Sequence, residues 1–264
     1  MIKIGMTGMN KNSEYINHFN QQSDQYSLCR PDYPEALFDY LATQVDANAQ
    51  VWDCGTGNGQ AAKALASRFQ QIFATDINAG QLEVATRMAN IEYYCCPADK
   101  TPLKPGTINL ITVAQALHWF NFDDFYEEVR RVSAENALFF AWCYSLGYFN
   151  EPAIDEPIRH LYYEILGKHY WPRERFYIDE EYKTIPCPFI REATPSFSIE
   201  KGFNLPQLMG YLATWSAVKE YQKHQNHNPL DLIATQLATA WGEPSHERLI
   251  HWPLHCLSAR VNKF

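Results

Sequence analysis

The segment Val51-Trp52-Asp53-Cys54-Gly55-Thr56-Gly57-Asn58-Gly59 carries the clearest structural signal in this chain. An apolar run ends in an aspartate, three glycines follow at alternate positions, and residues 60–69 then place apolar side chains at helical spacing. This order predicts a strand, a tight turn and a helix. Glycines are needed in such a turn because the backbone enters conformations that a Cβ forbids and approaches a ligand closely. We therefore expect the turn to cradle a ligand.

The spacing of the glycines indicates which ligand. A dinucleotide fingerprint requires G-x-G-x-x-G, whereas this chain has G-x-G-x-G, with Gln60 at the place of the third dinucleotide glycine. No G-K-[ST] follows, which excludes a P-loop. A second apolar run, residues 71–76, ends in Asp76, whose carboxylate can accept both hydroxyls of a ribose. The pattern favours a nucleoside ligand over an ordinary glycine-rich turn in some other α/β protein.

In this order, the strand, glycine turn, helix and acidic residue resemble the class I S-adenosylmethionine-dependent methyltransferases, whose first motif reads D-x-G-x-G-x-G. The resemblance implies S-adenosylmethionine as cofactor. It also implies an α/β fold, with a Rossmann-like, seven-stranded, mainly parallel sheet covered by helices on both faces. A helical insertion, the lid, is expected between the fifth and sixth strands.

The composition limits the other possibilities. The 264 residues suffice for one large domain, and a net charge of -8 with a pI of about 5.6 argues against a nucleic-acid partner. Seven scattered cysteines without a C-x-x-C pair predict reduced thiols and a cytoplasmic location. No signal peptide is visible, and no apolar run approaches the ~20 residues of a membrane helix. The histidines lack zinc-site spacing, so we expect no metal.

A second match to the family lies near the amino terminus. Residues 19–34 read Phe-x6-Tyr-x3-Arg-Pro-x-Tyr-Pro, which resembles the amino-terminal element of a methyltransferase type 11 subgroup that includes the trans-aconitate methyltransferases. There the element lies over the cofactor. The resemblance implies that Tyr26 and Arg30 reach the cofactor, because a guanidinium suits a carboxylate. A surface arginine and a core tyrosine are the alternative.

The remaining cofactor contacts follow from the same resemblance. It implies that the turn forms the cradle, that Asp76 holds the ribose, and that Asp99 lies beside the adenine. Asp53 is expected to order the turn or to reach the methionine amine through water. The full predicted set is Tyr26, Arg30, Asp53, Gly55, Thr56, Gly57, Asp76, Ile77, Ala98, Asp99 and Gln115.

The reacting methyl is expected near the end of the fourth strand. Residues 108–115 are almost continuously apolar, as in a strand covered on both faces, and His118 and Trp119 follow directly. Ligands in open α/β sheets lie outside the carboxyl ends of strands. The phrase Ala-Gln-Ala-x-His-Trp-Phe also recurs in the subgroup. We therefore predict His118 as the catalytic candidate and Trp119 as a substrate contact, with a packed aromatic cluster as the alternative.

The chain is expected to form a single domain, residues 1–264, in three parts. Residues 13–146 are the cofactor-binding half, residues 147–190 the lid insertion, and residues 191–264 the strands and helices that complete the sheet. Strands are expected at residues 196–200 and 248–261. Side chains of the lid that can line a pocket are Tyr162, Tyr163, His169, Tyr170, Trp171, Arg173 and Arg175. Of these, Trp171 and Arg173 are assigned to the substrate, and two inward arginines would indicate a carboxylate.

The predicted function is methyl transfer from S-adenosylmethionine to a small-molecule acceptor, with carboxylates as a candidate class. Methyl transfer depends largely on proximity and orientation, and needs a base only if the acceptor arrives protonated. Two alternatives remain open. One is a catalytically silent protein that binds S-adenosylmethionine, and the other is an NAD-dependent oxidoreductase. The oligomeric state is not predicted.

Overall fold

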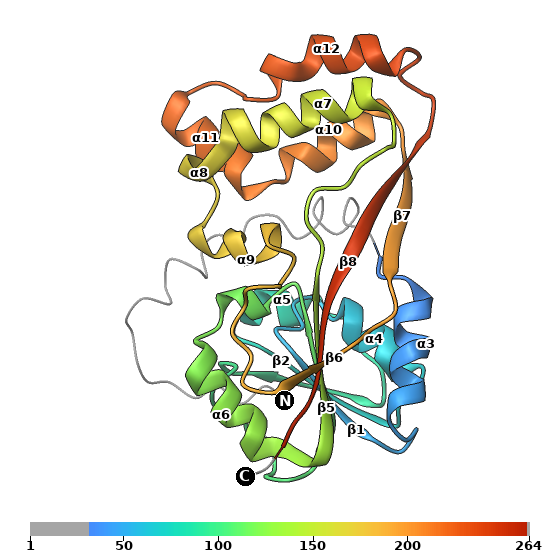
Figure 1. The fold of residues 1–264 in the computed structure, drawn as a ribbon, viewed down its shortest axis with the longest axis vertical. Coiled ribbons are helices and arrows are strands. Elements are labelled where there is room, and N and C mark those ends of the chain that lie inside the picture. Colours follow the sequence, from blue (N-terminus) through green and yellow to red (C-terminus); the bar gives the residue numbers. More distant parts are fainter. Residues whose placement is uncertain (1–31, 263–264) are drawn as a thin grey trace.

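The computed structural model describes residues 32–262, which fold around an eight-stranded sheet (Figure 1). Seven strands run in the order β3-β2-β1-β4-β5-β8-β6, and β7 pairs with β8 off this path. Strands β1 to β5 run parallel to one another, and β8 lies antiparallel to both β5 and β6. The strands are β1 (Gln50–Cys54), β2 (Gln71–Asp76), β3 (Ile91–Cys95), β4 (Ile108–Ala114), β5 (Ser133–Cys143), β6 (Ile190–Glu192), β7 (Phe197–Phe203) and β8 (Arg248–Arg260).

The helices form two groups. The first accompanies the sheet and comprises α3 (Glu35–Gln44), α4 (Gln60–Ala66), α5 (Ala79–Glu83), the 3-10 turn η1 (Leu117–Trp119) and α6 (Phe122–Val132). The second comprises α7 (Pro152–His160), the π-helical turn η2 (Leu161–Leu166), α8 (Gly167–Tyr170), the 3-10 turn η3 (Arg173–Arg175), α9 (Phe176–Asp179), α10 (Leu205–Ala213), α11 (Ser216–Gln225) and α12 (Asp231–Trp241). Most of the second group gathers at one end of the molecule (Figure 1).

Both faces of the sheet are buried, as β5 shows. Its side chains alternate between two cores: Leu138, Phe140 and Trp142 join the cluster that contains α3 and α4, whereas Phe139 and Ala141 join the cluster that contains α6. Alternate residues of a strand point to opposite faces, so a strand apolar at every position needs a cover on each side. The Rossmann-like α/β class with helices on both faces is confirmed.

The helices at the end of the molecule come from two separate segments. Helix α7, from the predicted insertion, packs against α12, and α8 packs against α11. Ile154 and Ile158 of α7 share one buried cluster with Ile233 and Leu237 of α12. An amphipathic helix gains stability by burying its apolar face against another element. The lid is therefore built from helices that precede β6 and helices that follow β7.

The strand expected at residues 196–200 is present as β7, but the sequence missed a short strand, β6, that precedes it, so the sheet has eight strands where seven were predicted. Strand β6 is the edge strand of the main sheet, where Ile190 pairs with Arg260 and Glu192 with Ser258. All three residues of β6 are exposed, so the sequence carries no alternation that could reveal it. The alternating segment is β7, which buries Ile199 and Phe203 and pairs with the other half of β8.

Strand β8 connects the sheet to the lid. Its carboxyl half pairs with β5, as Cys256 does with Trp142, and its amino half pairs with β7, as Ile250 does with Lys201. Within the half of β8 that pairs with β7, the backbones of His251 and Tyr148 exchange hydrogen bonds of 3.0 and 2.8 Å. The 13 residues of β8 thus form a continuous link between the two parts of the molecule (Figure 1).

Candidate active site

The glycine turn lies between β1 and α4 and has left-handed backbone at all three glycines. Their φ angles are +68° at Gly55, +57° at Gly57 and +84° at Gly59. A Cβ at Gly55 would lie 2.6 Å from the Cβ of Ala116, and one at Gly59 would lie 2.6 Å from the hydroxyl of Tyr93. At Gly57 no described atom would come closer than 3.8 Å. The first and third glycines are required by packing, and the middle one leaves its face open to a ligand.

Asp53 is buried beside this turn and is hydrogen-bonded to it. Its side chain is 0% exposed, and its two carboxylate oxygens accept hydrogen bonds from the hydroxyls of Thr56, at 2.5 Å, and Thr112, at 2.8 Å. Burial raises the pKa of Asp53 to about 6, although the two hydroxyls act in the opposite direction. The geometry shows Asp53 ordering the turn, which is one of the two roles expected for it.

Asp76 ends β2 directly beside the turn, because the carboxyl ends of neighbouring parallel strands meet at one edge of a sheet. One of its oxygens accepts the backbone N–H of Gly57 and the other that of Asn78, each at 2.8 Å. Burial raises the pKa of Asp76, and these amides lower it. A carboxylate oxygen has two acceptor positions, so each oxygen can still receive a hydroxyl. The next side chain, Ile77, is 43% exposed and offers an apolar surface beside the carboxylate.

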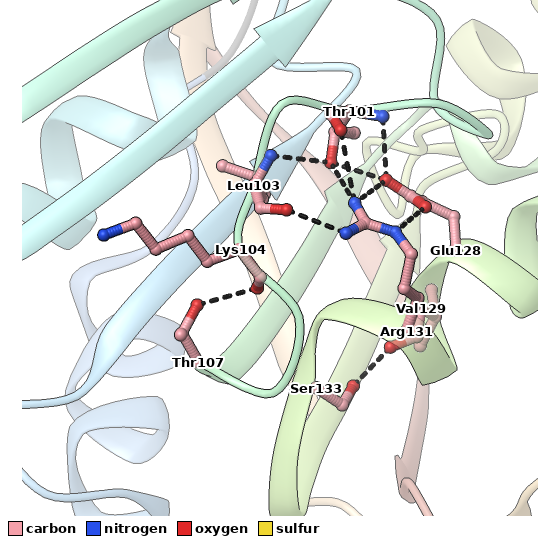
Figure 2. A network of polar contacts seen from close by, with 8 residues as sticks. All are labelled: Thr101, Leu103, Lys104, Thr107, Glu128, Val129, Arg131 and Ser133. Atoms are coloured by element: carbon pink, nitrogen blue, oxygen red, sulfur yellow. Dashed lines mark hydrogen bonds and ion pairs between the residues drawn. The ribbon is translucent and has the colours of Figure 1, made fainter.

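The loop after β3 is held in place by a partly buried ion pair between Glu128 and Arg131, shown in Figure 2. The carboxylate of Glu128 accepts the N–H of Thr101 at 2.7 Å and two N–H groups of Arg131 at 2.6 Å. Arg131 in turn donates to the carbonyl of Leu103 at 2.9 Å. Helix α6 therefore fixes the segment that carries the half-buried Ala98 and the exposed Asp99.

Gln115 follows β4 at the same edge and has an unusual conformation for a residue other than glycine, with φ at +56°. Its backbone N–H donates to the carbonyl of Trp142 at 2.9 Å, and its side-chain Nε2 donates to the carbonyl of Tyr144 at 3.1 Å. The buried Oε1 has no partner among residues 32–262. A buried acceptor without a donor is costly, so it suits an ammonium or N–H group of a ligand. The open Gly57, the paired oxygens of Asp76 and this Oε1 fit a nucleoside that carries an amino acid.

His118 lies in η1, next to the end of β4, and is only 4% exposed. Its Nδ1 lies 3.0 Å from the hydroxyl of Tyr182, and its ring packs against Trp119 at a centroid distance of 4.9 Å. Burial lowers the pKa of His118 to about 3, and the charge of Arg175 lowers it further. His118 is therefore a neutral imidazole at physiological pH.

Arg175 is the lid cation that faces His118, through the contact between η3 and η1. Its guanidinium lies 4.6 Å from the ring centroid of Trp171 and 5.3 Å from that of Tyr162, and its Nε donates to the Tyr162 hydroxyl at 2.7 Å. The Arg175 side chain is 22% exposed, and Asp179 lies 3.8 Å from its Nε. Within the described residues, its two Nη nitrogens have no hydrogen-bond partner.

Arg173, the arginine assigned to the substrate from sequence, is exposed in the same turn. Its role as a substrate contact stays a prediction, as does that of the half-buried Trp171. Arg175 appeared only among the residues able to line a pocket. Its spacing of four from Asp179 places the two on one helical face, and this signal would have distinguished it from Arg173.

Tyr26 and Arg30, expected over the cofactor, lie outside the described residues. Within residues 32–262, no three histidine, cysteine, aspartate or glutamate side chains are grouped closely enough to hold a metal ion. In the same part of the chain, each helix is too short or too polar to cross a bilayer.

Comparison with known proteins identifies the family. Residues 52–141 match the family model described as a methyltransferase domain. A Dictyostelium discoideum protein described as a methyltransferase is 34% identical over 232 residues, which cover 87% of this chain and 88% of that protein. The solved structure of an Anaeromyxobacter dehalogenans protein, described as a type II methyltransferase, is 36% identical. It covers 89% of this chain and 99% of the other, with a TM-score of 0.83.

A more distant structure has the same fold. The phosphoethanolamine N-methyltransferase 2 of Haemonchus contortus, solved in complex with S-adenosyl-L-methionine, is 13% identical. It covers 97% of this chain and 61% of that one, with a TM-score of 0.50. The chain belongs to the methyltransferase domain family and is an S-adenosylmethionine-dependent methyltransferase.

Proposed function

We propose that this enzyme transfers the methyl group of S-adenosylmethionine to a small-molecule carboxylate. The observation that carries the proposal is the position of Arg175, which is held by two aromatic rings beside His118 with both Nη nitrogens uncommitted within the described chain. A planar guanidinium in such a frame is suited to a bidentate contact with a carboxylate.

The residues proposed to bind the cofactor lie at the carboxyl edge of the sheet and in the loops that leave it. When bound, S-adenosylmethionine supplies an electrophilic methyl on a positively charged sulfur. Gly55, Thr56 and Gly57 cradle its amino-acid part, the Oε1 of Gln115 accepts from its ammonium, and Asp76 accepts the two ribose hydroxyls. The exposed face of Ile77 and the loop at Ala98 and Asp99 adjoin the adenine. Tyr26 and Arg30 complete this proposed set.

The charges in the site favour an anionic acceptor. The cofactor brings a positive sulfur, and Arg175 adds a second positive charge that Asp179 offsets only at 3.8 Å. In a partly buried site, two like charges repel each other more strongly than in water. An acceptor with a negative charge removes this repulsion and gains a hydrogen-bonded partner. Trp171, Trp119 and Arg173 are proposed as further contacts of the acceptor.

A carboxylate acceptor also explains the neutral state of His118. Carboxylates are already ionised at physiological pH, so no base has to remove a proton before the methyl moves. What the protein must supply is alignment of an acceptor oxygen with the methyl group. The likeness of residues 19–34 to the trans-aconitate methyltransferase subgroup supports beginning with small polycarboxylic acids. The free cysteines of the described chain are in keeping with the proposed cytoplasmic location.

Two assays test the function. Calorimetric titration with S-adenosylhomocysteine and with NADH should show binding of the first alone. Transfer of a labelled methyl group from S-adenosylmethionine is then screened against small mono-, di- and tricarboxylic acids, with their amides as matched neutral compounds. Labelling of acids but not amides is the expected result. Retained cofactor binding without transfer to any acid would overturn the proposed acceptor and favour the silent binding protein.

The matched pair Arg175→Gln and Arg173→Gln tests the role of the lid arginine. Loss of a charged hydrogen bond of about 1.5–3 kcal/mol should raise the KM for the acid roughly 10- to 100-fold in Arg175→Gln. Arg173→Gln, a change to an exposed arginine in the same turn, should raise KM by a clearly smaller factor, because water screens the charge of an exposed side chain. Melting temperature and S-adenosylhomocysteine affinity control for folding. Equal KM values in both variants would contradict the assignment of Arg175.

A further inference from the structure

The segment that carries Tyr182 has a strained backbone. Glu181 and Tyr182 have φ angles of +57° and +58°, so two consecutive residues other than glycine are left-handed. Each costs about 1 kcal/mol or more relative to an ordinary conformation. Such a pair persists only where the surroundings hold it, and strained residues of this kind collect at functional sites.

The surroundings of this turn are well defined. The N–H of Tyr182 donates to the carbonyl of Tyr177 at 2.8 Å. Arg191, from β6, donates to the carbonyl of Tyr182 at 3.0 Å and to that of Ile185 at 2.6 Å. The Tyr182 side chain is only 1% exposed, and its hydroxyl reaches the Nδ1 of His118 at 3.0 Å. The turn therefore presents one buried hydroxyl to the imidazole.

The placement of protons in this pair can be deduced. The backbone N–H of His118 also faces the Tyr182 hydroxyl and lowers its pKa, although burial raises that pKa well above its ordinary value. The phenol O–H is buried, so it needs an acceptor of its own within the protein. Among the described residues its one acceptor is the Nδ1 of His118. The opposite arrangement would leave a buried O–H unsatisfied, at a cost of about 1–3 kcal/mol.

We propose that Tyr182 is a positioning residue that holds His118 in the neutral tautomer protonated at Nε2. Nδ1 is occupied by the Tyr182 O–H, and Nε2 has no partner among residues 32–262. His118 therefore offers an N–H donor to the acceptor molecule and does not remove a proton. The identity of the acceptor group that receives this hydrogen bond rests on the proposed function. The assignment of the His118 tautomer does not depend on that function.

The tautomer is measured directly by nitrogen NMR on the full protein with 15N-labelled histidine, bound to S-adenosylhomocysteine at pH 7. The signal of His118 is assigned by its loss in His118→Gln. The expected spectrum has Nδ1 of the unprotonated type and Nε2 of the protonated type. The reverse assignment, or an exchanging mixture, would overturn the proposal. Since no acceptor is added, failure of the carboxylate hypothesis leaves this measurement unaffected.

The role of Tyr182 is tested by Tyr182→Phe, with Tyr177→Phe as the control from the same segment. In Tyr182→Phe the single tautomer should give way to a mixture. With an acceptor in hand, kcat should fall about tenfold while S-adenosylhomocysteine affinity is kept, as for loss of one oriented hydrogen bond. Tyr177→Phe should retain the tautomer. An unchanged His118 spectrum in Tyr182→Phe would show that another group sets it and would overturn the assignment.

Discussion

Asp53 illustrates what a single residue contributes in this fold. A carboxylate buried beneath the turn loses its hydration, and the hydroxyls of Thr56 and Thr112 replace it in part. The raised pKa of Asp53 reflects the part of the desolvation cost that these hydrogen bonds do not offset. In return, Asp53 connects the turn to β4 and fixes the backbone that faces the ligand. Ionised Asp53 therefore destabilises the folded protein, but its hydrogen bonds fix the conformation of the turn.

This cost predicts a pH dependence that Asp53→Asn should remove. The folded-state pKa of about 6 exceeds the reference value of 3.8, so the folded protein binds the proton more tightly than the unfolded chain. Ionisation therefore destabilises the fold progressively from about pH 4 to pH 6, and the full penalty of about 3 kcal/mol is present above that range. Urea unfolding of both proteins from pH 4 to pH 7 should show that the free energy of unfolding of the variant rises relative to that of the wild type as pH increases. Parallel curves would contradict this account.

Some single residues could be assigned from the sequence, and others could not. The strand-turn-helix motif predicts that Asp53, Gly57 and Asp76 lie together, and in the structure Asp53 bonds the turn residue Thr56 and Asp76 bonds Gly57. Tyr182 was not predicted, because its role arises from a contact with His118, which lies 64 residues away along the chain. No local pattern encodes such a pairing.

At the scale of elements, α6 and the loop after β3 behave as one unit. The Glu128 carboxylate, 6% exposed, collects donors from the loop and from Arg131. Burial alone would raise the pKa of Glu128, but the hydrogen bonds from Arg131 and Thr101 outweigh it, and the pKa is lowered. The ionised pair thus stabilises the fold and holds the loop at the predicted adenine position.

The pair Glu128→Gln and Glu127→Gln tests this unit. Removing the buried charge should lower the free energy of unfolding by about 1–3 kcal/mol at pH 7 and weaken S-adenosylhomocysteine binding, because the loop loses its anchor. The exposed Glu127 on the same helix should tolerate the change. Since the folded pKa of Glu128 is lowered, its stabilisation is present above the ordinary carboxyl pKa of 4.5 and is lost as pH falls through the lowered value. Equal stability of the two variants at pH 7 would refute the role of the ion pair.

The elements themselves were largely predictable. The apolar runs predict β1, β2 and β4, and the helical spacing of residues 60–69 predicts α4, all of which the structure confirms. The exception is β6, which consists of three exposed residues and is defined only by its pairing with β8. An edge strand without a buried face has no sequence signature of its own.

At the scale of the whole molecule, the predicted lid proves to be half of a larger helical body. Residues 147–190 were predicted as the lid insertion, and their helices pack on α11 and α12, which follow β7. The amphipathic pattern showed that each helix has an apolar face. It could not show which other helix covers that face, because periodicity carries no information about partners.

Two chimeras test whether the helices of residues 147–190 depend for stability on the helices that follow β7. In the first, residues 147–190 are replaced by the equivalent segment of the Anaeromyxobacter dehalogenans protein, and in the second, residues 147–255 are replaced together. The first mixes unmatched halves of one core and should melt several degrees below the second, since each lost kcal/mol lowers Tm by about 2–4 °C in a protein of this size. A first chimera as stable as the second would show that the two segments pack independently.

Strand β8 gives this arrangement an evolutionary consequence. One end of the strand belongs to the sheet that carries the glycine turn, and the other end pairs with β7 and belongs to the part that we propose meets the acceptor. A gene that recombines within the lid splits this strand from its partner β7 or separates α7 from α12. New acceptor preferences should therefore arise by point substitution among the aromatic side chains beside Arg175, such as Tyr162 and Trp171, or by inheritance of the whole second half of the gene as one block.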